Sequence, residues 1–138
     1  MINLNPEVEF PYMRMYVVDA LRSLGDPVHQ RTKWGVYVEG VSYYDDLDLN
    51  IHILYDDCMV LPSPGRAVPE ILYEAEVPAL LALEAVFGPL IDELGDVTDE
   101  IYLDHPRWTD VVSAARVAYE TMLANDDKAR SSPGSTSG

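Results

Sequence analysis

The chain has 138 residues, of which 48% are hydrophobic and 24% are charged. This length and apolar content fit one globular domain that buries its own core without disulfides or a structural metal. The 24 acidic residues against 9 basic ones give a net charge of −15, which argues against binding nucleic acid or anionic lipid through a basic surface.

Several features of the sequence bear on where the protein is found. The first residues lack the basic start and apolar run of a secretion signal, and no uncharged stretch approaches the roughly 18 apolar residues that span a bilayer. The single cysteine, Cys58, cannot form an internal disulfide. We therefore expect a cytoplasmic protein that makes no membrane contact.

The negative charge is concentrated in the middle of the chain. Residues 41–104 hold 15 acidic residues and a single basic one, Arg66, whereas the two flanking parts are close to neutral. An acidic surface of this kind speeds encounter with a basic partner, and its effect weakens as salt rises. The alternative is that the charge serves solubility alone.

Two helices are predicted near the N-terminus. Apolar residues of 12–24, Tyr16 among them, recur at helical spacing on one face, and Gly25 follows as a stop. Asp26 and Pro27 then have the pattern of an N-cap and a first helical residue. This pattern predicts a second, shorter helix that ends near residue 34, followed by a loop.

Residues 46–61 admit two interpretations. Alternating apolar and polar residues between Leu47 and Ile53 are typical of a half-buried strand, which would make a small hairpin. The spacing of Leu47, Ile51 and Leu54 also fits one face of a helix, and the aspartates before it favour a helix N-terminus. We prefer the helix.

A proline-rich crossing separates the two halves of the predicted fold. Residues 62–65 predict a turn, and residues 67–73 predict an irregular crossing. From 76 to 94 the apolar residues form one long helical face, which Pro89 should bend and Gly95 should end.

The last part of the chain predicts two further helices. Thr98 can cap a short helical turn. Asp104 and Pro106 repeat the pattern of a cap followed by proline, which predicts that the final helix begins there. Trp34 and Trp108 are both expected to pack in the core.

These elements together predict an all-α fold, a single domain of about five helices with an irregular proline-rich central crossing. The helical domain is expected to span residues 12–124. An N-terminal arm precedes it over residues 1–11. Residues 125–138 are polar and rich in serine and glycine, which predicts a disordered tail.

Three stretches of the sequence have a familiar pattern. They are Leu24, Asp26, Pro27, Gln30 and Trp34; then Asp56 and Asp57; then Tyr102, Leu103, Asp104, His105, Pro106, Trp108, Val112, Ala114, Ala115 and Arg116. Together they resemble a family of small, acidic, uncharacterised actinobacterial cytosolic proteins over about residues 12–124. The resemblance implies a shared fold and no known reaction. A looser similarity in size, acidity and helical content is to cytosolic immunity proteins that neutralise contact-delivered toxins.

One group of residues has metal-ligand chemistry. Asp48, His52 and Asp56 are spaced four residues apart, so on a helix they line one face and offer oxygen and imidazole ligands to a divalent metal. The alternative is a solvated helix face on which the two acids favour the protonated form of His52.

Motifs of enzymes and cofactor sites are missing from the sequence. It contains no G-x-G-x-x-G, P-loop, H-E-x-x-H or C-x-x-C pattern and no exposed-serine turn for a hydrolase triad. Ile51 stands where a calcium loop needs glycine, and Asp57 beside Cys58 disfavours a reactive thiolate. We therefore expect no cofactor and no enzymatic activity.

The candidate partner-binding residues belong to the acidic central face. They are Asp45, Asp46, Asp48, Asp56 and Asp57, with Tyr43 and Tyr44 beside them. Tyrosine beside carboxylate suits a surface that grips a basic protein, although tyrosines near loops also cover a core. The leading hypothesis is a non-enzymatic protein that binds a basic protein partner, as an immunity protein or an inhibitor of a nuclease toxin. A small metal-binding protein or metal-dependent enzyme and a DNA-mimic inhibitor are the alternatives.

Overall fold

The computed structural model describes residues 4–36 and 45–131, and its regular elements within these ranges are all helical. In chain order they are α1 (Pro11–Leu24), α2 (Pro27–Lys33), α3 (Leu47–Ile51), the π-helix η1 (His52–Asp57), the 3-10 helices η2 (Pro64–Ala67) and η3 (Glu74–Glu76), α4 (Val77–Leu94), α5 (Asp99–Leu103) and α6 (Trp108–Arg130). The all-α prediction is confirmed. The helix preferred for residues 46–61 is present over residues 47–57 as α3 and η1, and it ends before Cys58 rather than at residue 61. The strand alternative there is wrong.

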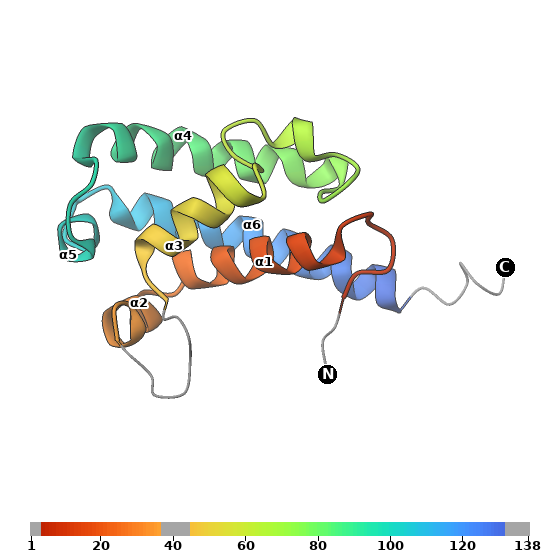
Figure 1. Ribbon diagram of the computed structural model, residues 1–138, viewed down its shortest axis with the longest axis horizontal. Helices are drawn as coiled ribbons and strands as arrows, with labels where there is room; N and C mark the ends of the chain where they lie inside the picture. The colour runs from red at the N-terminus through yellow and green to blue at the C-terminus, as the bar shows by residue number, and fades with distance from the viewer. Residues whose placement is uncertain (1–3, 37–44, 132–138) are drawn as a thin grey trace, which may run out of the picture.

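The longest helix, α6, lies at the centre of the fold. It packs against α1 on one side and against α4 on the other, while α3 and η1 lie across α1 (Figure 1). The short helix α5 closes the end at which α4 passes into α6 (Figure 1). The core lies where these helices meet, and it includes Val17, Leu54, Phe87 and Met122, none of which is exposed to solvent.

The turn after α1 fits closely against α6. A Cβ added to Gly25 would lie 3.2 Å from the Cα of Arg116, so any side chain at residue 25 would press on the α6 backbone. The guanidinium of Arg116 also donates a hydrogen bond to the Gly25 carbonyl oxygen at 2.6 Å. The glycine predicted to stop α1 therefore also sets the distance between α1 and α6.

Two tryptophans join α2 to α6, as expected of core residues. Their rings meet edge to face with centroids 6.1 Å apart. Trp108 donates its indole N–H to Gln30 Oε1 at 2.9 Å, and Trp34 donates to Ser23 Oγ at 2.8 Å. Both buried indole groups thus have a partner, which buried tryptophan requires. Residues that carry the family resemblance in two distant stretches of sequence meet at this point.

A buried ionic cluster joins the arm before α1 to the end of α6. Arg14 donates from Nε to Asp126 at 2.7 Å, and Asn5 donates to the same carboxylate oxygen at 2.7 Å. Because Asp126 and Ala129 are buried, α6 continues to Arg130. The prediction that the disordered tail begins at residue 125 is therefore wrong for residues 125–130, where tertiary contacts hold a polar sequence in a helix.

The start of α6 also differs from its prediction. The helix begins at Trp108, with Arg107 at the N-cap position, rather than at Asp104 and Pro106. Asp104 instead follows α5 as its C-cap, and its carboxylate pairs with Arg31 at 2.9 Å. Thr98 precedes α5 without a side-chain capping bond. The same cap-like pattern therefore ends one helix here instead of starting the next.

Candidate acidic binding surface

The predicted partner-binding aspartates all lie in one short stretch, residues 45–57, which we call the acidic segment. Asp46 caps α3, because its Oδ1 accepts a hydrogen bond from the Leu49 backbone N–H at 2.7 Å. Asp45 precedes it and accepts hydrogen bonds from Ser23 Oγ at 2.7 Å and from Asn50 Nδ2 at 3.0 Å. These two carboxylates are thus fixed in place by the fold.

One row of side chains on the acidic segment faces solvent. It consists of Asp48, His52 and Asp56, whose side chains are 75%, 55% and 61% exposed. His52 Nδ1 lies 2.7 Å from Asp56 Oδ2, and its Nε2 lies 3.5 Å from Asp48 Oδ2. The hydrogen bond with Asp56, followed by the charge of Asp48, raises the pKa of His52 above 6.5. The row therefore favours the protonated imidazole.

This geometry bears on the metal site predicted at Asp48, His52 and Asp56. Across residues 4–36 and 45–131, no group of three or more His, Cys, Asp or Glu side chains is placed to hold a metal ion. His52 Nδ1 is hydrogen-bonded to Asp56 and Nε2 lies 3.5 Å from Asp48, whereas a histidine ligand turns one nitrogen lone pair toward the metal. The structure favours the solvated row over the metal site.

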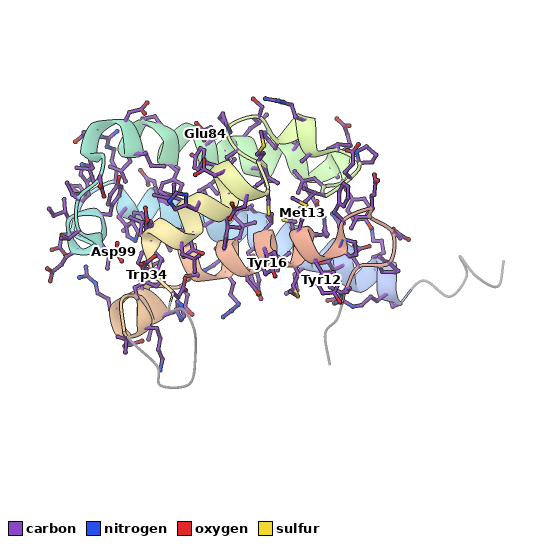
Figure 2. All side chains as sticks on the ribbon, viewed as in Figure 1. Tyr12, Met13, Tyr16, Trp34, Glu84 and Asp99 are labelled. Atoms are coloured by element: carbon purple, nitrogen blue, oxygen red, sulfur yellow. The ribbon has the colours of Figure 1, made fainter. Side chains whose placement is uncertain are left out.

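A second row on the acidic segment faces α1 across a groove. The row consists of Asp45, Leu49, Ile53 and Asp57, and α1 contributes residues that include Met13, Tyr16 and Asp19. We call the hollow between them the α1–η1 groove; its volume is about 740 Å³. In Figure 2, Tyr12, Met13 and Tyr16 follow one another along α1, with Met13 on the side nearer to η1. The acidic segment therefore presents carboxylates in two directions.

Cys58 lies on the floor of the groove, immediately after η1. Its side chain is buried, and its thiol lies 3.6 Å from the Met13 carbonyl oxygen. Burial, assisted by the charge of Asp57, raises the pKa of the thiol to about 11. The thiol is therefore protonated near neutral pH, in agreement with the expectation of an unreactive cysteine.

The structure places some of the tyrosines near the acidic segment but not the two predicted to bind a partner. Tyr43 and Tyr44 lie outside the described residues. The Tyr55 hydroxyl donates to Glu84 at 2.6 Å, so that ring serves an internal contact. Tyr16 was expected on the buried face of its helix, but it is 51% exposed and lines the groove, as α3 and η1 cover only part of α1.

The contribution of α1 to this surface was missed in the sequence. Asp19 lines the groove opposite the acidic segment. Asp99, on α5, adds a further carboxylate near the start of α3, where it accepts a hydrogen bond from the Leu47 backbone N–H at 3.3 Å. Burial raises the pKa of Asp99, the hydrogen bond from the Leu47 N–H lowers it, and repulsion from Asp46, Asp48 and Asp45 raises it further, so the net shift is upward. Only the tertiary fold brings these acids together. The scarcity of bases in residues 41–104 was a signal for Asp99, whereas no pattern in the sequence pointed to Asp19.

The fold and this surface define a small, acidic, all-helical protein. Residues 8–130 match the model of a domain of unknown function, DUF7945, and the chain therefore belongs to this uncharacterised family. The match confirms that the chain belongs to an uncharacterised family. The matched residues extend beyond the expected range of 12–124 and reach the end of α6. No curated protein and no solved structure matches the chain. In the part of the chain that the structure describes, no helix is long and apolar enough to cross a membrane.

Proposed function

We propose that the protein binds a basic protein partner through the acidic segment and acts as a non-enzymatic inhibitor, such as an immunity protein against a nuclease toxin. The observation that carries this proposal is the lack of lysine or arginine at the segment. Among the described residues, Asp45, Asp48 and Asp56 form their ion pairs with histidines, and no lysine or arginine pairs with them. A basic surface would supply the missing positive charge.

The same arrangement suits inhibition of a protein that acts on nucleic acid. Such a protein binds phosphates with lysine and arginine, so a carboxylate surface can occupy the same site without resembling the substrate in any other way. Charge of this kind raises the rate of encounter and makes it sensitive to salt. The proposal places the protein in the cytoplasm, where a single thiol stays reduced.

A charge-neutralised variant tests the proposal without disturbing the fold. Asp48→Asn, Asp56→Asn and Asp57→Asn together remove three exposed charges from the acidic segment. Asp45 and Asp46 are left unchanged because they hold the start of α3. The matched control removes three exposed acids of α5 and α6, by Glu100→Gln, Asp110→Asn and Glu120→Gln.

The experiment uses the full chain and both variants as baits in a lysate of the source cells, at low and at high salt. We expect a basic protein to bind the unmodified chain and the control at low salt, and to be released by high salt. The triple variant of the acidic segment should retain roughly a tenth of it or less. Equal retention by all three baits, or no basic protein on any of them, would contradict the proposal.

A further inference from the structure

The α1–η1 groove has an apolar floor. Met13 comes from α1, Ile53 comes from η1, and Cys58 closes the floor where η1 ends. A second hollow of about 210 Å³ adjoins it, because both are lined by Met13 and Cys58. The floor therefore continues from the middle of α1 toward its N-terminal end.

Large apolar side chains remain exposed beside this floor. Tyr16 is 51% exposed, Met59 is 53% exposed and Phe10 is 43% exposed. Tyr16 lines the α1–η1 groove, while Phe10 and Met59 line the adjoining hollow. Apolar side chains that gather around one hollow are typical of an interaction site, and methionine adapts readily to a partner surface.

Met59, which lines the adjoining hollow, has an unfavourable backbone conformation. Its φ is 54°, in the left-handed region that a residue with a side chain adopts at a cost. Glycine would adopt this conformation without that cost. The methionine side chain therefore contributes an exposed apolar surface where glycine would suit the backbone better.

The rim of the groove is mainly acidic. Asp19, Asp45 and Asp57 line it together with Arg22 and His29, and Asp45 is paired with His29 at 2.7 Å. The Arg22 guanidinium lies 3.8 Å from Asp19, and both side chains are more than half exposed, so this pairing is weak. Partial burial raises the pKa of Asp19, the charge of Arg22 lowers it and the charge of Asp45 raises it. Positive charge from a ligand would stabilise the ionised carboxylates.

The shape and charge of the groove select one kind of occupant. A groove between two helices suits a third helix, whose apolar residues at i, i+3, i+4 and i+7 enter it. A second copy of this chain is disfavoured because it would bring acids of a molecule of net charge −15 against an acidic rim. Lysine and arginine beside the apolar residues of a helix complement both floor and rim.

We infer that the α1–η1 groove binds one amphipathic, basic helix of the protein partner. The apolar side chains of that helix lie on Met13, Ile53 and Cys58 and reach Met59 in the adjoining hollow, and its lysines or arginines lie at Asp19 and Asp57. This assignment rests on the proposed function and names the site and the class of structure that the partner presents.

The test uses a synthetic amphipathic helix of about 15 residues, close to the length of α1, with leucines on one face and lysines and arginines on the other. A permuted peptide of identical composition has no apolar face. Binding is measured by fluorescence anisotropy, and the site is located by amide chemical shifts. We expect the amphipathic peptide to bind at least roughly tenfold more tightly, with shifts along α1 and η1. Equal affinities, no binding by either peptide, or shifts elsewhere would overturn the inference.

A variant of Met59 separates binding from folding. Met59→Gly removes the exposed side chain and the strained conformation together, so we expect unchanged stability and roughly tenfold weaker binding of the amphipathic peptide. Leu81→Ala, which truncates an exposed apolar residue of α4, should leave the affinity unchanged. Equal affinity of the Met59→Gly variant and the unmodified chain would contradict the inference.

The two proposals fail in different ways. If a basic protein is captured through the acidic segment but neither peptide prefers the groove, the proposed function stands and the groove assignment is rejected. If the amphipathic peptide binds in the groove but no basic protein is captured, the groove binds such helices and the inhibitor function is rejected.

Discussion

Arg14 and Glu76 form a two-armed ion pair inside the core, with Nη1 and Nη2 of the guanidinium 2.8 and 2.6 Å from the two carboxylate oxygens. Both side chains are 1% exposed. The pair connects α1 to Glu76, the residue that precedes α4. The additional hydrogen bond from Arg14 to Asp126 connects α1 to α6 as well. Hydrogen bonds from the buried guanidinium to the Glu76 and Asp126 carboxylates replace its contacts with water. The stability of the protein should therefore depend on Arg14 and on both carboxylates.

The first prediction concerns a variant that lacks the cation of this cluster, Arg14. Arg14→Met leaves Glu76 and Asp126 buried without a counter-charge, so we expect the free energy of unfolding to fall by about 3–5 kcal/mol. Urea unfolding followed by circular dichroism measures it. Arg22→Met, which removes an exposed arginine from the same helix, should change stability by less than about 1 kcal/mol. Similar losses in both variants would contradict the role assigned to Arg14.

The second prediction concerns the close approach at Gly25. Gly25→Ala places a Cβ 3.2 Å from the Arg116 backbone, so we expect a loss of about 1–3 kcal/mol in stability. Gly65→Ala is the matched control, because a Cβ there has no atom within 4 Å. Thermal unfolding of the two variants should differ clearly. A Gly25→Ala variant as stable as the control would show that α1 and α6 can move apart.

The third prediction concerns the pH dependence of the His52 row. Because the pKa of His52 is raised by Asp56 and then by Asp48, NMR titration should give a value above 6.5, and Asp56→Asn should lower it. A raised folded-state pKa adds stability that is complete below the unfolded-state pKa and is lost as pH rises through the folded-state value. The stability difference between the unmodified chain and His52→Asn should therefore shrink over this range. A pKa at or below 6.5 would contradict the observed pairing.

The fourth prediction concerns the thiol on the groove floor. The pKa of Cys58 is raised to about 11, so the rate at which iodoacetamide alkylates it should rise with pH to a midpoint near 11 instead of near 9. A disulfide reagent should react slowly with the folded protein at neutral pH and rapidly after unfolding in urea. Fast reaction of the folded protein would show that Cys58 is not held against Met13 as the structure has it.

Local patterns in the sequence account for most of the helices. The apolar repeat of α1, the Asp26 cap and the glycine after α4 each act within a few neighbouring residues, so the sequence was enough to predict them. The polar residues near Asp126 gave the wrong prediction, because the partner that buries this carboxylate, Arg14, is 112 residues away. Tertiary contacts override local composition there.

The candidate site was predicted only in part. The acidic segment is visible in the sequence because its aspartates lie within residues 45–57. The groove is not visible, because it depends on the packing of η1 against α1, and no local pattern specifies which helices meet. For the same reason the exposure of Tyr16 was not predicted: α1 has an apolar stripe wider than the surface that α3 and η1 cover.

The central claim is that carboxylates of the acidic segment hold a basic protein partner. Its most direct test is the affinity of the captured basic protein for the unmodified chain, the Asp48, Asp56 and Asp57 variant, and the Glu100, Asp110 and Glu120 control, at two salt concentrations. The account predicts that the segment variant binds at least roughly tenfold more weakly at low salt, while the control keeps most of the affinity. Equal weakening in both variants would show that total charge, and not this surface, determines binding, and would contradict the account.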